Sequence, residues 1–294
     1  MRYRIIPSNS QKIDIGTIYT SPFYEVAMVM CDFAGLDTTI RLNHSITAWC
    51  DDKKSGFLPH ETCLGKVSNV LRGLSSAFSY MQLSVLEVQN DSCNEVYSQH
   101  GYTEYDIYRY HYFVFCHGVS TIHDLFLRLI GILCDVNLNN GKKWENISAD
   151  LTSKGHINII SQMNTFFDLI KGHVKMRQKA SHEGLIWHRR LDNYHLTNIW
   201  SNIQKQFPNI KIERLEYSKG TYQNQELLSQ SKEEFVNELN DVITKMIEQT
   251  HQLFDSLLPL LINKLDESFI SSHYSALEEL HMSNIDKYVL ANFK

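Results

Sequence analysis

A chain of 294 residues with 43% hydrophobic side chains can bury a substantial core, either as one large domain or as two closely packed ones. Its formal net charge of −5 excludes a protein that coats nucleic acid through an overall positive field, so any phosphate-binding site is local. The N-terminus lacks the apolar run of a signal peptide, and no later segment stays apolar and uncharged for about 18 residues. We therefore expect a cytoplasmic protein without a membrane span, whose six cysteines include no CxxC pair and are reduced.

Helical periodicity dominates the chain after its first twenty residues, which we expect to form short extended pieces. Two helical stretches are predicted between about residues 22 and 92, separated by a polar segment. The clearest long helix is predicted over 103–138, and a second over 157–183. Gly184 is placed to end that second helix, because glycine adopts the left-handed conformation of a helix C-terminus at little cost.

The C-terminal third continues the helical pattern. A shorter helix is expected around 194–206, and a last one is predicted to start at a capping box formed by Ser231 and Glu234. Pro259 is expected to kink or end it. Because the intervals between these elements are mostly short, the sequence predicts an all-α protein built as an antiparallel helical bundle.

Common cofactor and metal motifs are missing from the sequence. It contains no phosphate-binding loop, no dinucleotide-binding glycine pattern and no GxSxG elbow. His182 and Glu183 resemble the start of a zincin helix, but Ile186 stands where the second histidine is needed. We therefore expect neither a cofactor nor a metal.

A basic island stands out in this net-acidic chain. Between positions 171 and 190 a single acid, Glu183, accompanies six basic residues, which are Lys171, Lys175, Arg177, Lys179, Arg189 and Arg190. Such an island is a candidate phosphate site. The alternative interpretation is a solvated helix face with extended lysine side chains.

The island overlaps a recognisable motif. Residues 177–184 have the sequence RQKASHEG, which resembles the Arg-x4-6-His signature of the HEPN superfamily (higher eukaryote and prokaryote nucleotide-binding domains). Asp124, in the preceding helix, resembles a family position that often carries an acid. A second pair of the same spacing, Arg190 and His195, is an alternative; we favour the first because it closes a well-patterned helix and continues as His-Glu-Gly.

The resemblance covers about residues 101–206 and implies a bundle of HEPN type with additional N- and C-terminal helices. It divides the chain into a mostly helical region 1–100, the HEPN-like core 101–206 and a helical region 207–294, unless the whole chain forms one compact domain. It also implies a homodimer in which the two motifs face each other across the two-fold axis.

The implied activity is metal-independent RNA cleavage. His182 would act as the base near neutral pH, and Arg177 would supply the cation for the charged transition state. The resemblance adds Asp124 to these two catalytic residues. RNA or phosphate binding is expected of Lys175 and Lys179 in the basic island and of Gln178, which follows Arg177 where the family usually has Asn or another small polar residue. On one uninterrupted helix, residues five apart are turned by about 140°, so the helix must end between Arg177 and His182 or a second subunit must help.

The family also suggests a biological setting, that of a toxin or host-defence effector with an antitoxin or regulatory protein as a further partner. Two alternatives stay open. One is a catalytically inactive HEPN-like module that binds RNA, a nucleotide or another protein. The other is a purely structural helical protein.

Overall fold

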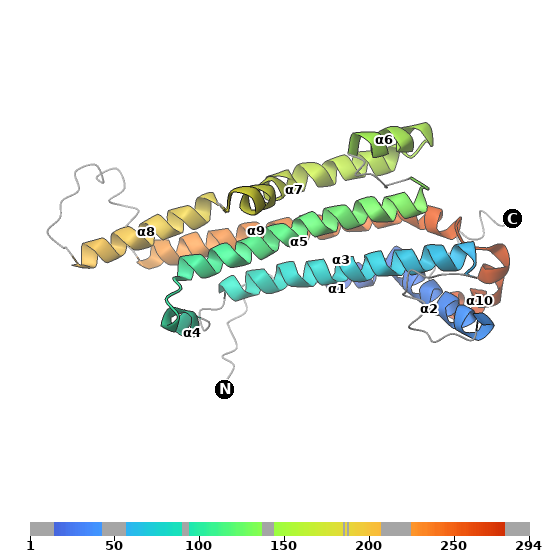
Figure 1. Ribbon diagram of the computed structural model, residues 1–294, viewed down its shortest axis with the longest axis horizontal. Coiled ribbons are helices and arrows are strands. Elements are labelled where there is room, and N and C mark those ends of the chain that lie inside the picture. The colour runs from blue at the N-terminus through green and yellow to red at the C-terminus, as the bar shows by residue number, and fades with distance from the viewer. Residues whose placement is uncertain are drawn as a thin grey trace.

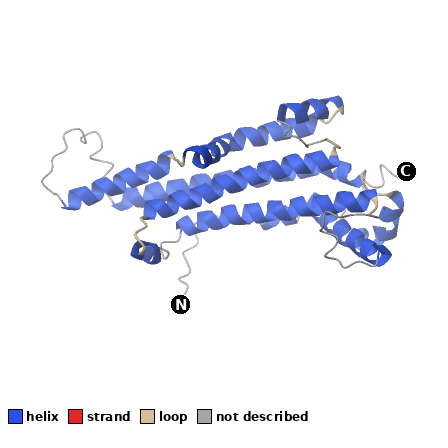
Figure 2. Ribbon diagram, in the orientation of Figure 1, coloured by secondary structure: helices blue, strands red, loops and turns tan. Residues whose placement is uncertain are grey.

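The computed structural model describes residues 15–42, 57–89, 94–136, 144–184, 186, 188–206 and 225–279. Every regular element in these ranges is a helix, which confirms the all-α prediction (Figure 2). Four long helices pack into a bundle, in which α9 lies partly behind α5 in Figure 1. Their bounds are α3 Pro59–Gln89, α5 Glu104–Leu133, α7 Ile157–Glu183 and α9 Gln225–Ile262.

The four long helices alternate in direction around the bundle. Phe126 packs on Phe166, whereas Tyr112 contacts His173, so α5 and α7 run antiparallel as predicted. Gly118 of α5 lies against Ala77 and Met81 of α3, which is the close approach expected where a helix carries glycine. The α9 helix lies between α3 and α7 and runs parallel to α5, its diagonal neighbour.

Shorter helices cover the ends and sides of this bundle. The α8 helix, Arg189–Gln206, continues beyond α7 and packs on α9 and on the start of α5, whereas α2, Pro22–Leu42, packs on α3 and α9. The remaining helices are α1 Gly16–Tyr19, α4 Asn94–Gln99, α6 Trp144–Ser153 and α10 Glu267–Glu279. Trp144 anchors α6 to α7 by donating a hydrogen bond of 2.8 Å to the Asn164 side chain.

One continuous hydrophobic core joins the N-terminal, central and C-terminal parts of the described chain. Its largest fully buried side chains include Phe23, Phe78, Phe126 and Phe254, which come from α2, α3, α5 and α9. The described helices therefore share one core. The α5 helix is also long and apolar enough to cross a membrane by length and composition, and a helix in the core of a bundle passes the same test.

Several boundaries differ from the sequence prediction. The predicted extended pieces fall partly on residues 1–14, outside the described ranges, and are wrong at Gly16–Tyr19, which form α1. The α8 helix begins at Arg189 instead of residue 194. The capping box is wrong, because α9 begins at Gln225 and Ser231 lies inside it. Pro259 also lies within α9 and does not end it.

Candidate functional site

The last turns of α7 carry the predicted motif on an exposed helix end. The helix continues unbroken to Glu183, and Gly184 stops it with φ 67°, in the left-handed region. The Gly184 N–H still bonds to the Ala180 carbonyl oxygen at 3.2 Å. The predicted C-terminal stop is therefore confirmed.

The motif side chains face solvent to different degrees. Arg177 is half-buried, whereas the side chains predicted to bind phosphate are exposed, namely Lys175, Gln178 and Lys179. His182 is exposed too, and within the described part of the chain neither it nor the two lysines form a hydrogen bond or ion pair. These groups are free to meet an external ligand.

The basic island is divided by its ion pairs. Lys171 pairs with Asp168 at 3.0 Å, and Arg190 pairs with Glu234 and Glu238 of α9. Arg189 has no such partner among the described residues. Two of the six basic residues of the island, Lys171 and Arg190, are therefore committed to internal ion pairs.

Arg177 and His182 do not converge within one chain. Because α7 is continuous between them, they are turned by about 140° and displaced by about 7.5 Å along the axis. The helix does not end between them, so the first way of bringing them together, considered from the sequence, does not apply. A single site containing both residue types would need two chains.

Asp124 lies near Arg177 but not near His182. Its neighbour His123 contacts Asp124 at 3.3 Å and packs against Phe167 of α7. That hydrogen bond lowers the pKa of Asp124, and the charge of Arg177 adds to the effect. His182 lies fifteen residues beyond Phe167, about 22 Å further along the helix axis. Antiparallel packing of the two long helices would be expected to bring Asp124 toward the Arg177–His182 end of α7. In the structure Asp124 stands opposite the middle of α7, within reach of the Arg177 charge but far from His182.

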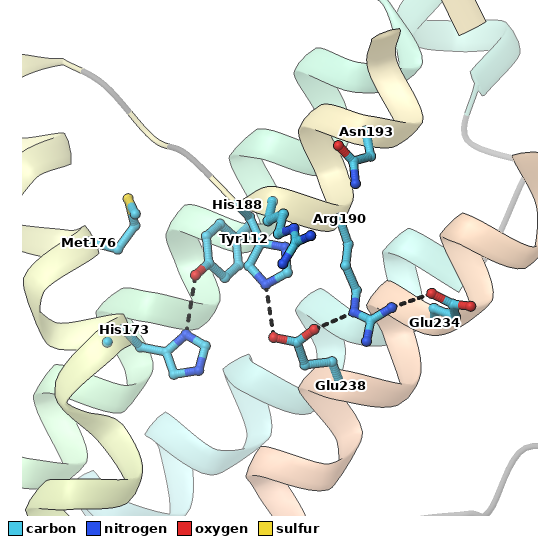
Figure 3. A pocket seen from close by; sticks show the side chains of 10 residues that line it. Tyr112, His173, Met176, His188, Arg190, Asn193, Glu234 and Glu238 are labelled. Atoms are coloured by element: carbon cyan, nitrogen blue, oxygen red, sulfur yellow. Dashed lines mark hydrogen bonds and ion pairs between the residues drawn. The ribbon is translucent and has the colours of Figure 1, made fainter. Parts of the chain in front are cut away.

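A cavity of about 690 Å³ opens beside this helix end, between α5, α7, α8 and α9. Figure 3 shows its interior, where ring side chains from α5, from α7 and from the residue just before α8 meet ionic side chains of α8 and α9. Tyr112 and His188 are buried in its wall, and His173 is partly buried. The other lining residues are Gly172, Met176, Arg189, Arg190, Asn193, Glu234 and Glu238.

His188 is held by a carboxylate. Its Nε2 lies 3.2 Å from Glu238 Oε1, and Arg190 Nε donates to Glu238 Oε2 at 2.6 Å (Figure 3). An ionised carboxylate only accepts hydrogen bonds, so His188 Nε2 carries the proton and Nδ1 is an acceptor. That Nδ1 is buried and has no partner among the described residues. Burial lowers the pKa of His188, against the opposing charge of Glu238, so the imidazole is neutral at pH 7.

His173 is a second neutral imidazole. The Tyr112 hydroxyl lies 3.2 Å from its Nδ1, and Cys116 Sγ lies 4.0 Å from the same atom. Burial lowers the pKa of His173 to about 4, and the neighbouring His188 pushes it the same way. Burial also raises the pKa of Tyr112, so its hydroxyl keeps its proton, and the tautomer of the His173 ring sets which of the two groups donates.

Sequence reasoning missed His173, His188 and Glu238. One signal was present, because His173 follows Met163, Phe166 and Ile170 at helical spacing and so lies on the buried face of α7. A polar residue on an apolar face is a candidate functional or structural contact. His188 and Glu238 carry no comparable signal, since one lies just before a helix and the other on a polar stretch of α9.

The alternative Arg190 and His195 pair is engaged in internal contacts. Arg190 holds the two α9 carboxylates, and the His195 ring stacks on Tyr105 with 3.8 Å between centroids. Tyr105 in turn donates to Asp192 at 2.5 Å. These contacts join α8 to α5 and α9 and account for both residues as packing elements.

Comparisons with family models, curated proteins and solved structures find no match to this chain. Among the described residues no cluster of three or more histidine, cysteine, aspartate or glutamate side chains is arranged to hold a metal ion.

Proposed function

We propose that this chain is a metal-independent endoribonuclease of HEPN type that works as a homodimer, with Arg177 and His182 as its catalytic residues. One observation carries the proposal: the RQKASHEG motif lies at the exposed end of an amphipathic helix that stops at Gly184. His182, Lys175 and Lys179 have no partner there within the described chain. An imidazole and cations that no acid neutralises are the groups a phosphate-cleaving site needs.

The chemistry is an internal displacement at phosphorus. The His182 imidazole takes the proton of a ribose 2′-hydroxyl, whose oxygen then bonds to the adjacent phosphorus. The bond from phosphorus to the 5′-oxygen breaks. That oxygen takes a proton from water as it leaves, and the His182 imidazolium returns its proton to the solvent. The products are a 2′,3′-cyclic phosphate and a 5′-hydroxyl. Arg177 stabilises the extra charge on the phosphate oxygens, because its planar guanidinium matches them and stays protonated.

A second copy of the chain would bring together Arg177 and His182, which point apart within one chain. A two-fold contact between α7 ends would set Arg177 of one subunit opposite His182 of the other. It would also gather four free lysines, two from each chain, into a stronger positive field around RNA. Asp124 acts on Arg177 by charge in this arrangement and touches no reacting atom.

The test is RNA cleavage in excess EDTA. We expect wild-type protein to cut single-stranded RNA under this condition, leaving cyclic phosphate ends, because no bound cation takes part. Arg177→Ala and His182→Ala are each expected to lower the rate about 10²–10⁴-fold. Arg128→Ala and His117→Ala are matched controls, since both side chains are exposed on α5 and lie outside the motif. Activity that requires a divalent ion, or full activity in both motif variants, would refute the proposal.

A catalytically inactive RNA-binding module is the second candidate. It is favoured by the separation of Asp124 from His182 and by the free lysines, which bind phosphate without any chemistry. Salt-dependent RNA binding without cleavage, weakened by Lys175→Ala and Lys179→Ala, would select this candidate. The setting as a toxin or host-defence effector, with an antitoxin or regulatory partner, is part of the proposal and rests on the motif resemblance.

A further inference from the structure

The cavity beside the motif helix has the size and polarity of a small-molecule site. Its volume of about 690 Å³ falls within the usual range for ligand pockets. Its walls combine the rings of Tyr112, His173 and His188 with a few polar groups (Figure 3). Its rim reaches Met176, the residue next to Arg177.

The interior of the cavity has no excess of positive charge. Its two carboxylates, Glu234 and Glu238, are paired with Arg190, and the second guanidinium group of the lining, Arg189, is exposed at the edge. Both histidines that line it are neutral at pH 7 for the reasons given above. A dianionic ligand would gain no net attraction inside and would meet two carboxylates. A neutral ligand with both donors and acceptors suits this lining.

Free positive charge lies at the rim and beyond it. Arg189 is exposed at the edge of the cavity without a partner in the described chain, and Lys175 is exposed one residue from Met176. A ligand with a neutral aromatic end inside the cavity and a phosphate outside it would satisfy both regions.

We infer that the cavity between α5, α7, α8 and α9 binds a nucleobase of the RNA, with the sugar and phosphate of that nucleotide directed toward Arg189 and the motif end of α7. The inference rests on the proposed function for the identity of the ligand as RNA. It adds a base-binding subsite, formed by Tyr112, His173 and His188, to a motif that by itself contacts only the backbone.

Gly172 provides a way to close this site without removing a charge. It lies at the rim, and a side chain added there would meet nothing within 4 Å. It also sits inside α7, where replacing glycine favours the helix. Gly172→Leu is therefore expected to obstruct the cavity in a folded protein, and Gly172→Ala, with a single methyl group, is the matched control.

The experiment is calorimetric titration with the four ribonucleoside 5′-monophosphates and with ribose 5-phosphate, which has the sugar and phosphate but no base. We expect at least one monophosphate to bind wild-type protein about tenfold or more tightly than ribose 5-phosphate, because base stacking supplies the difference. Gly172→Leu should weaken that binding about tenfold or more, whereas Gly172→Ala should leave it within about threefold. Thermal unfolding of each variant verifies the fold.

Three results would overturn the inference: equal binding of ribose 5-phosphate and the monophosphates, unchanged binding by Gly172→Leu, or no saturable binding of any monophosphate at millimolar concentration. The titration needs no cleavage, so it separates the two proposals. Cleavage without base binding would refute the base-binding subsite and support the nuclease proposal. Base binding without cleavage would support the subsite and refute the nuclease proposal.

Discussion

Replacing His173 by glutamine is expected to flatten the dependence of stability on pH below neutrality. In the folded chain the pKa of His173 is lowered to about 4 by burial, whereas in the unfolded chain it returns to about 6.5. Between these values the unfolded state binds the proton and the folded state does not. Stability is therefore fully present above pH 6.5 and is lost as the pH falls toward 4.

The size of the loss follows from the separation of the two pKa values. Each pH unit of difference corresponds to about 1.4 kcal/mol, so His173 accounts for about 3 kcal/mol in total, of which about 2 kcal/mol is lost between pH 7 and pH 5. Cys116, Tyr112, His188 and Glu238 surround the ring or lie nearby. None of them is changed by the substitution, so the difference between the two proteins isolates His173.

Urea unfolding followed by circular dichroism, at half-unit steps from pH 7.5 to pH 5, measures this effect. His173→Gln keeps a polar side chain for the Tyr112 hydroxyl but cannot take up a proton. The wild-type curve should fall more steeply than the variant curve by about 2 kcal/mol over this range. His117→Gln, on the exposed face of α5, is the control and should follow wild type. Parallel curves for wild type and His173→Gln would refute the argument.

Two further predictions concern packing and polar contacts. Glu238→Ala should lower the free energy of unfolding by about 2 kcal/mol, because it leaves the buried N–H of His188 without an acceptor. Glu234 lies one turn earlier and is more exposed, so Glu234→Ala should lower it by less than about 1 kcal/mol in the same urea titration. Gly118→Ala should destabilise the fold by about 1–3 kcal/mol, since its added carbon would lie 2.4 Å from Met81 Cγ. Gly172→Ala should instead raise the stability by up to about 1 kcal/mol, because its added carbon meets nothing within 4 Å. Equal changes in stability for Glu238→Ala and Glu234→Ala, or for Gly118→Ala and Gly172→Ala, measured by thermal and urea unfolding, would contradict the contacts described.

The long helices were predictable because each carries its own apolar stripe. The predicted limits of the helix over 157–183 coincide with α7, and the glycine stop at its end is where the sequence places it. The α6 helix was missed because only two of its residues, Ile147 and Leu151, are buried, and two positions make no periodic pattern. The start of α9 was misplaced because a capping box is a local signal that also occurs inside helices.

The motif could be found in the sequence, but the cavity beside it could not. Arg177 and His182 belong to one short segment with a recognisable spacing. The cavity instead brings together residues that are far apart in the chain, namely Tyr112, His173, His188 and Glu238. They meet where α7 ends and α8 begins to pack along α9. That geometry depends on tertiary packing, which local sequence patterns do not predict.

Subunit complementation tests the composite site most directly. Arg177→Ala and His182→Ala proteins, each inactive alone, are mixed under conditions that exchange subunits, and RNA cleavage is followed in EDTA. A mixed dimer holds one intact site when Arg177 and His182 act from opposite chains, so the mixture should regain about a quarter of wild-type activity. No recovery in a mixture shown to contain mixed dimers would contradict the composite site.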